Sequence, residues 1–144
     1  MTSEDLYDAE VLRMAREATG AGRLDAPHGA ATVDNPLCGD RVTFEVRLVG
    51  GRIAALAHRA RGCLLCEAAA SLLGAAAAGA SAAEVAEARA AAAAILTADA
   101  PTPAGPWARL ETFRPVRAVR SRHGCVLLPF DALGEALANA GRSP

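Results

Sequence analysis

The 144-residue sequence contains no lysine and only five aromatic residues. All 15 basic side chains are arginine, and they nearly balance the 16 acidic ones, which leaves a formal net charge of −1. This balance argues against a general polyanion-binding surface, and the shortage of rings argues against a stacking platform for single-stranded nucleic acid. We therefore expect no nucleic-acid partner.

Long apolar runs are also absent. The longest uncharged stretch lies between Glu67 and Glu84, is rich in alanine, glycine and serine, and is shorter than the roughly 20 strongly apolar residues of a membrane span. The acidic first ten residues lack the positive charge and apolar core of a signal peptide. These absences predict a cytoplasmic protein with no membrane partner, and the length fits a single domain over residues 1–144.

Alternating apolar side chains predict a β-hairpin. Strands are expected over residues 41–48 and 53–60, joined by a turn at Gly50 and Gly51. The preceding loop is rich in turn-forming residues, and a short strand over residues 30–33 is the only regular element expected there. The hairpin is therefore the best-defined part of the predicted sheet.

Helical periodicity accounts for much of the remaining chain. Helices are predicted over residues 4–18, 64–78 and 81–98, the last of which begins with the capping-box spacing Ser81-Ala-Ala-Glu84. Asp131 is the expected N-cap of a final helix. A proline- and glycine-rich break precedes an arginine-rich, partly buried arm over residues 109–122.

The four cysteines are the centre of the expected chemistry. Inside a reducing compartment they seldom form structural disulfides, which favours metal ligation or sulfur chemistry. Cys38 lies in the turn-rich loop, Cys63 between an expected strand and helix, and Cys125 just before the expected final helix. Three thiolates and one carboxylate suit zinc or an iron-sulfur cluster, and Asp40, two residues after Cys38, is the natural fourth ligand.

Such a site needs positive charge nearby. Three thiolates and a carboxylate bring about four negative charges against a formal charge of about +2 from zinc or an oxidised two-iron core. Arg122, three residues before Cys125, is expected to balance the excess, together with the positive end of the helix that follows Cys63.

Three motifs resemble, in order, the signatures of the U-type iron-sulfur cluster assembly scaffolds, the family of IscU, SufU and the N-terminal part of NifU. They are Asn-Pro-Leu-Cys-Gly-Asp over residues 35–40, Gly62-Cys63, and Arg122-x-x-Cys125. Two features resemble the SufU branch. The last two motifs are far apart, and Gly124 stands in place of a histidine before Cys125.

This resemblance implies a SufE/NifU-like α+β fold, in which a small antiparallel three-stranded sheet packs against several helices. It implies that Cys38, Asp40, Cys63 and Cys125 bind zinc, and that Cys38 takes persulfide sulfur from a SufS-like cysteine desulfurase. IscU-like relatives instead assemble a transient [2Fe-2S] cluster at these positions and pass it to recipient apoproteins. A sulfurtransferase-like acceptor, a non-enzymatic scaffold and a structural zinc adaptor without turnover are the three open interpretations.

Cys66 stands where these relatives usually carry serine. It forms an i, i+3 pair with Cys63 on one helix face, and could replace Asp40 as a ligand, act as a resolving thiol, or pack as a small buried hydrophobe. A thioredoxin-like role is disfavoured because the βαβ context of that motif is missing. His123, beside Cys125, is expected to be a solvated residue rather than a ligand.

Overall fold

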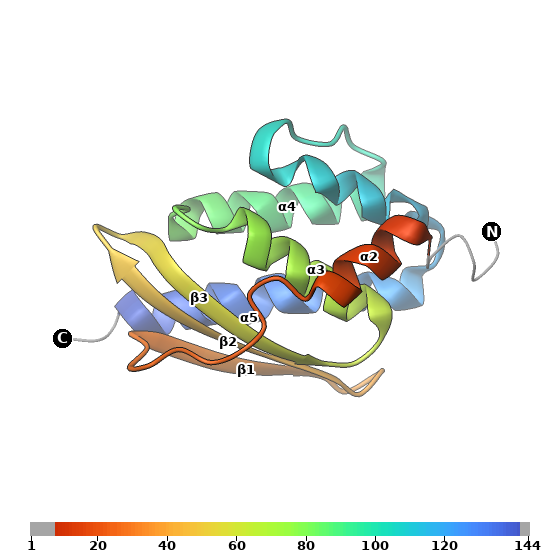
Figure 1. The fold of residues 1–144 in the computed structure, drawn as a ribbon. Coiled ribbons are helices and arrows are strands. Elements are labelled where there is room, and N and C mark those ends of the chain that lie inside the picture. Colours follow the sequence, from red (N-terminus) through yellow and green to blue (C-terminus); the bar gives the residue numbers. More distant parts are fainter. Residues whose placement is uncertain (1–7, 142–144) are drawn as a thin grey trace.

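In a computed structural model of the chain, residues 8–141 are described. The elements in chain order are α2 (Ala9–Glu17), β1 (Gly29–Asn35), β2 (Asp40–Val49), β3 (Arg52–Arg61), α3 (Leu64–Ala76), α4 (Ala82–Ala98), η1 (Gly105–Ala118), η2 (Arg120–Arg122) and α5 (His123–Gly141). The strands form one antiparallel sheet in the order β1-β2-β3, with helices packed against it (Figure 1). The predicted α+β fold class is confirmed. Residues 4–7 of the expected first helix lie outside the described residues.

The β2–β3 hairpin follows from its sequence pattern. Val42, Phe44 and Val46 are fully buried on one face of β2, while the residues between them are more exposed. Gly50 and Gly51 at the turn have φ of 60° and 75°, which glycine adopts without strain. Alternation of period two therefore buries one face of the hairpin, as predicted.

Strand β1 is longer than the sequence predicted. It pairs with β2 along its whole length, from Gly29 opposite Val46 to Asn35 opposite Asp40. Its own apolar content is low, so the neighbouring strand and the helix packed on it determine its length. The short expected strand is thus an edge strand of seven residues.

Helix α5 packs across β1 and β2 (Figure 1). Gly29 allows this close approach, because a Cβ atom there would lie 2.3 Å from the carbonyl oxygen of Ala136 and 2.5 Å from the nitrogen of Ala140. The inward side chains Phe130 and Leu133 are buried. Helices α3 and α4 lie beside α5, and α2 packs against α3.

The start of α5 corrects one prediction. Asp131 is not an N-cap: the helix begins eight residues earlier, at His123, and continues through Pro129. An interior proline removes a backbone donor, and the burial of the apolar face of α5 offsets this cost. Asp131 instead accepts a hydrogen bond from Nε of Arg89 at 2.6 Å. Cys125 consequently lies inside the first turn of α5.

The remaining helices follow their local signals. The capping box of α4 is confirmed, with the Ser81 side chain and the Glu84 side chain each bonded to the other's backbone. The arginine-rich arm forms the 3-10 helices η1 and η2, and its apolar residues Leu110, Phe113 and Val116, three apart, are buried. This spacing matches three residues per turn. Within residues 8–141, no helix is both long and apolar enough to cross a membrane.

The topology brings three junctions to one end of the sheet. The β1–β2 turn, the connection from β3 to α3, and the first turn of α5 lie near one another there (Figure 1). Each junction carries one cysteine of the predicted ligand set.

Candidate metal centre

Cys38 lies in the turn between β1 and β2, and Asp40 is the first residue of β2. The carbonyl oxygen of Asn35 accepts hydrogen bonds from the backbone N–H groups of Cys38 at 3.3 Å and Gly39 at 2.8 Å. The Asn35 side chain accepts another from the N–H of Leu37 at 3.1 Å, and Gly39 has a φ of 75°. This turn leaves Cys38 exposed and buries the Asp40 side chain.

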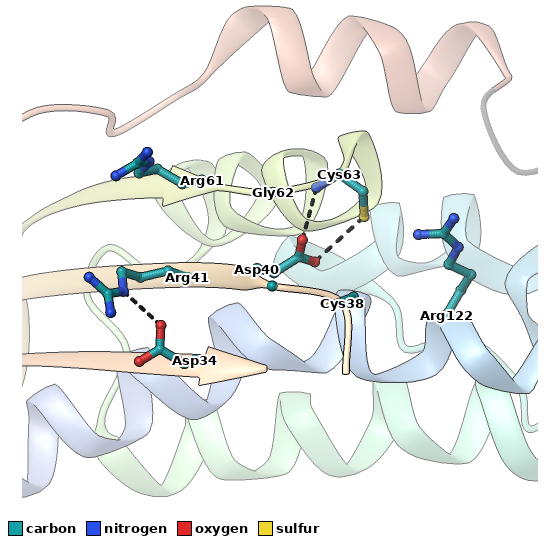
Figure 2. Close-up of a pocket in the computed structure, with 9 residues that line it drawn as sticks. Asp34, Cys38, Asp40, Arg41, Arg61, Gly62, Cys63 and Arg122 are labelled. Atoms are coloured by element: carbon teal, nitrogen blue, oxygen red, sulfur yellow. Dashed lines mark hydrogen bonds and ion pairs between the residues drawn. The ribbon is translucent and has the colours of Figure 1, made fainter. Parts of the chain in front are cut away.

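The Asp40 carboxylate is held by the start of α3. The backbone N–H of Cys63 donates to Oδ1 at 3.1 Å, and the Cys63 thiol donates to Oδ2 at 3.7 Å (Figure 2). Cys63 is the N-cap of α3, so the positive end of the helix faces the carboxylate. Gly62, the residue before it, leaves room for the carboxylate in this position, because a Cβ atom there would lie 2.3 Å from Oδ1. The motif is visible in the sequence, but this steric reason is not.

Three of the predicted ligands meet without rearrangement. The sulfur atoms of Cys38 and Cys125 and one carboxylate oxygen of Asp40 all lie within 4.8 Å of one another. The two sulfur atoms are 3.8 Å apart. Cys63 lies outside this set of three, although its sulfur is 3.7 Å from the same carboxylate.

The separation between the two sulfur atoms suits zinc. With Zn–S bonds of about 2.3 Å in tetrahedral geometry, two sulfur ligands lie about 3.8 Å from each other. The Cys38–Cys125 separation of 3.8 Å has this value. A donor set of soft sulfur atoms with one oxygen also matches the preference of zinc and of iron-sulfur clusters. The residues present therefore fit such a group.

The negative charge of the cluster acts on its own members. Burial raises the pKa of the Cys125 thiol, and the neighbouring Cys63, Cys38 and Asp40 raise it further. Ionisation of the Cys125 thiol is therefore unfavourable unless a cation is present, because the thiolate would be desolvated and would face its negative neighbours. A cation bound among these groups would favour the ionised form of Cys125.

Three arginines contribute to the lining of a cavity at this site. A cavity of about 640 Å³ is lined by Cys38, Asp40 and Cys63 together with the arginines at positions 41, 61 and 122. Nε of Arg41 donates to the Asp34 carboxylate at 2.6 Å. Figure 2 shows Arg122 on the side of the pocket away from Arg41 and Arg61. The predicted charge-balancing residue thus lines the same cavity as the thiols.

Cys66 and His123 do not join the set of three. Cys66 lies on α3 with no exposed surface, and burial raises the pKa of its thiol, with the charge of Asp40 as the next cause. His123 is not simply solvated, because its Nε2 atom lies 3.1 Å from the carbonyl oxygens of both Val116 and Arg117. This histidine fastens α5 to η1.

Comparisons with known proteins agree with the geometry. The family model described as NifU-like N terminal domain matches residues 6–108. The crystal structure of the N-terminal part of a nitrogen-fixing NifU-like protein from Brucella abortus superposes with a TM-score of 0.92 at 32% identity, covering 99% of each chain.

Two further relatives match very different shares of this chain. The structure of FiSufU from Fervidobacterium islandicum AW-1, an iron-sulfur cluster assembly scaffold protein for the SUF system, superposes with a TM-score of 0.85 over 94% of this chain and 99% of that one. At 21% identity, this likeness shows a shared fold. The bifunctional protein NifU/MnmA of Rubrobacter xylanophilus is 35% identical over 68 residues, which span 46% of this chain and 14% of that protein.

Proposed function

This chain belongs to the family of NifU-like N-terminal domains, and from that premise we propose that it serves iron-sulfur cluster assembly as a zinc-bound sulfur acceptor. Cys38 would take persulfide sulfur from a SufS-like cysteine desulfurase, and recipient apoproteins would be the final users of the sulfur. The observation that carries this proposal is that the sulfur of Cys38, an exposed residue, lies 3.8 Å from the sulfur of the buried Cys125 and beside a buried carboxylate. We take residues 1–144 as one functional domain in the cytoplasm.

We assign zinc binding to Cys38, Asp40, Cys63 and Cys125. The first, second and fourth of these already lie at ligand-like separations, and Cys63 contacts the same carboxylate. When bound, zinc would keep the thiolates ionised yet unreactive. The ligands would leave a net charge of about −2 around a divalent ion, which supports a balancing role for Arg122.

Cys38 is the best placed of the four cysteines to accept sulfur. It is exposed on a turn, whereas Cys66 and Cys125 are buried and Cys63 is partly buried. Once Cys38 has left the metal, its thiolate would attack the terminal sulfur of the desulfurase persulfide, and the desulfurase cysteine would leave as a thiolate. Leu37, beside it, is 96% exposed and offers an apolar contact to the desulfurase.

Alanine production from cysteine by the desulfurase tests the proposal. Wild-type protein should accelerate it, and Cys38→Ala should lose at least nine-tenths of that stimulation while keeping its fold, because the side chain is exposed. In the zinc-loaded protein, Cys66→Ser is the matched control and should stimulate like wild type. If Cys38→Ala stimulates as well as wild type, the acceptor is misassigned.

Assembly of a transient [2Fe-2S] cluster is the second candidate. The same four donors support it. A single oxygen ligand binds soft iron-sulfur centres less firmly than sulfur does, which suits a cluster that is held only transiently. Iron, acid-labile sulfide and a brown colour after purification would favour this candidate, and colourless zinc protein would favour sulfur acceptance. A structural zinc adaptor is the weakest of the three, because a closed structural site would bury the exposed Cys38.

A further inference from the structure

Cys66 is the one cysteine outside the proposed ligand set, and it has a defined position relative to Cys63. Cys63 is the N-cap of α3, with φ of −72° and ψ of 166°, and Cys66 is the third residue of the helix. Residues three apart on a helix share a face, with Cβ atoms about 5–6 Å apart. Cys63 and Cys66 are therefore an N-cap and N3 pair of thiols at the start of α3.

The two thiols differ in access. Cys63 lines the cavity beside Asp40, whereas Cys66 does not line it and is completely buried. A sulfur atom delivered from outside can therefore reach Cys63 but cannot reach Cys66 directly. The chain presents an outer thiol that receives and an inner thiol that can only react with its neighbour.

The cluster also connects the acceptor to this pair. The Cys125 sulfur lies 3.8 Å from the Cys38 sulfur, and the Cys125 thiol interacts with Cys63 as well. Cys63 in turn lies within electrostatic range of Cys66. The acceptor turn, the start of α3 and the first turn of α5 thus bring all four cysteines into one region of the molecule.

We propose that, in the metal-free chain, the Cys63–Cys66 pair reduces the sulfur accepted by Cys38 to sulfide. This activity rests on the proposed function and extends it. The Cys63 thiolate attacks the terminal sulfur of the Cys38 persulfide, so that Cys38 leaves as a thiolate and Cys63 carries the persulfide.

The second step releases the product. The Cys66 sulfur attacks the Cys63 sulfur, the bond to the terminal sulfur breaks, and the terminal sulfur leaves as hydrosulfide, which takes the Cys66 proton. Two thiols are oxidised to one disulfide and one persulfide sulfur is reduced to sulfide, so a single turnover requires no added reductant. The sulfide is formed next to the donors that would hold a metal ion. Serine at position 66 cannot carry out this step.

The test is a single turnover under anaerobic conditions. Reduced, metal-free protein is mixed with an equal amount of a SufS-like desulfurase that carries its persulfide and has been freed of cysteine. Released sulfide is trapped and quantified, and alkylated peptides are identified by mass spectrometry. Wild type should release about one sulfide per sulfur accepted and contain a Cys63–Cys66 disulfide.

Two variants make the result specific. Cys66→Ser should release at least ten times less sulfide while retaining persulfide on Cys38 or Cys63, and Cys66→Ala should behave the same way. Ser71→Ala is the matched control, because it alters another buried side chain of α3 and leaves both thiols in place. It should release sulfide like wild type.

The outcomes separate this inference from the proposed function. If Cys66→Ser accepts sulfur but wild type releases no more sulfide than this variant does, the inference is wrong and sulfur acceptance stands. A disulfide between Cys38 and Cys125 in place of the Cys63–Cys66 disulfide would also overturn it. If neither protein acquires persulfide, the proposed function fails and the inference fails with it.

Discussion

At the scale of single residues, the Asp40 carboxylate lies where a side chain at position 62 would otherwise be. The Cβ atom of alanine there would be 2.3 Å from Oδ1 and 2.4 Å from Cγ of Asp40. The same carboxylate is oriented by the N–H group of Cys63. Groups that orient a ligand usually change metal affinity when they are altered. Position 62 therefore controls the oxygen donor without contacting the ion.

Gly62→Ala should weaken zinc binding by about 10- to 100-fold, because the carboxylate must move away from the sulfur atoms. Competition with a chromogenic chelator measures the affinity. Gly134→Ala is the matched control, since a Cβ atom there meets nothing within 4 Å. Unchanged zinc affinity in Gly62→Ala would show that the carboxylate does not contribute to the site.

His58 makes stability depend on pH. Burial lowers the pKa of His58, and the hydrogen bond between its Nε2 and the Thr19 carbonyl oxygen, at 2.7 Å, opposes that effect only in part. Its Nδ1 atom is buried without a partner. The unfolded chain takes up this proton near pH 6.5, whereas the folded chain resists it. As the pH falls below about 6.5, the unfolded state binds more protons and the free energy of unfolding decreases.

Urea unfolding of metal-free protein at pH 7.5 and pH 5.5 measures this effect. Wild type should be less stable at pH 5.5, and His58→Asn should show a smaller difference between the two pH values. An equal difference in both proteins would assign the pH dependence to other groups.

At the scale of elements, the contact between β1 and α5 positions Cys125. Gly29→Ala would place a Cβ atom 2.3 Å from the Ala136 carbonyl oxygen, which belongs to the helix backbone and cannot rotate away. We expect a loss of about 1–3 kcal/mol in the free energy of unfolding, as for other overpacked contacts. Urea unfolding measures the loss, again with Gly134→Ala as the control. Wild-type stability in Gly29→Ala would contradict the close packing.

The hairpin and the capped helix α4 were predictable from sequence because their signals are local. Alternation buries Phe44 and its neighbours, and the capping box at Ser81 needs only four residues. The start of α5 was predicted wrongly, because Pro129 and Asp131 resemble a helix beginning and only tertiary burial extends the helix back to His123. Local patterns determine these elements only where no long-range contact overrides them.

At the scale of the whole molecule, segments far apart in sequence meet at one end of the sheet. The motifs around Cys38, Cys63 and Cys125 predicted which residues to consider, through a family resemblance. They did not predict that Cys63 stands slightly apart from the other donors, and they left the complete burial of Cys66 as one of several alternatives. Those facts depend on how α3 is packed, which no short motif encodes.

Zinc should stabilise the fold because it joins these distant segments. At a free zinc concentration 100 times the dissociation constant, the gain is about 2.7 kcal/mol, or roughly 10 °C in the midpoint of thermal unfolding. Calorimetry with and without chelator measures the shift, and Asp40→Ala should reduce it. An unchanged midpoint on zinc removal would mean that no ion links the three junctions.

Zinc K-edge X-ray absorption on the zinc-loaded protein tests the central claim most directly. The account predicts three sulfur neighbours at about 2.3 Å and one oxygen at about 2.0–2.2 Å, with one sulfur lost in Cys38→Ala, Cys63→Ala or Cys125→Ala. A shell of four sulfur atoms, or one that keeps three after any of these changes, would contradict it.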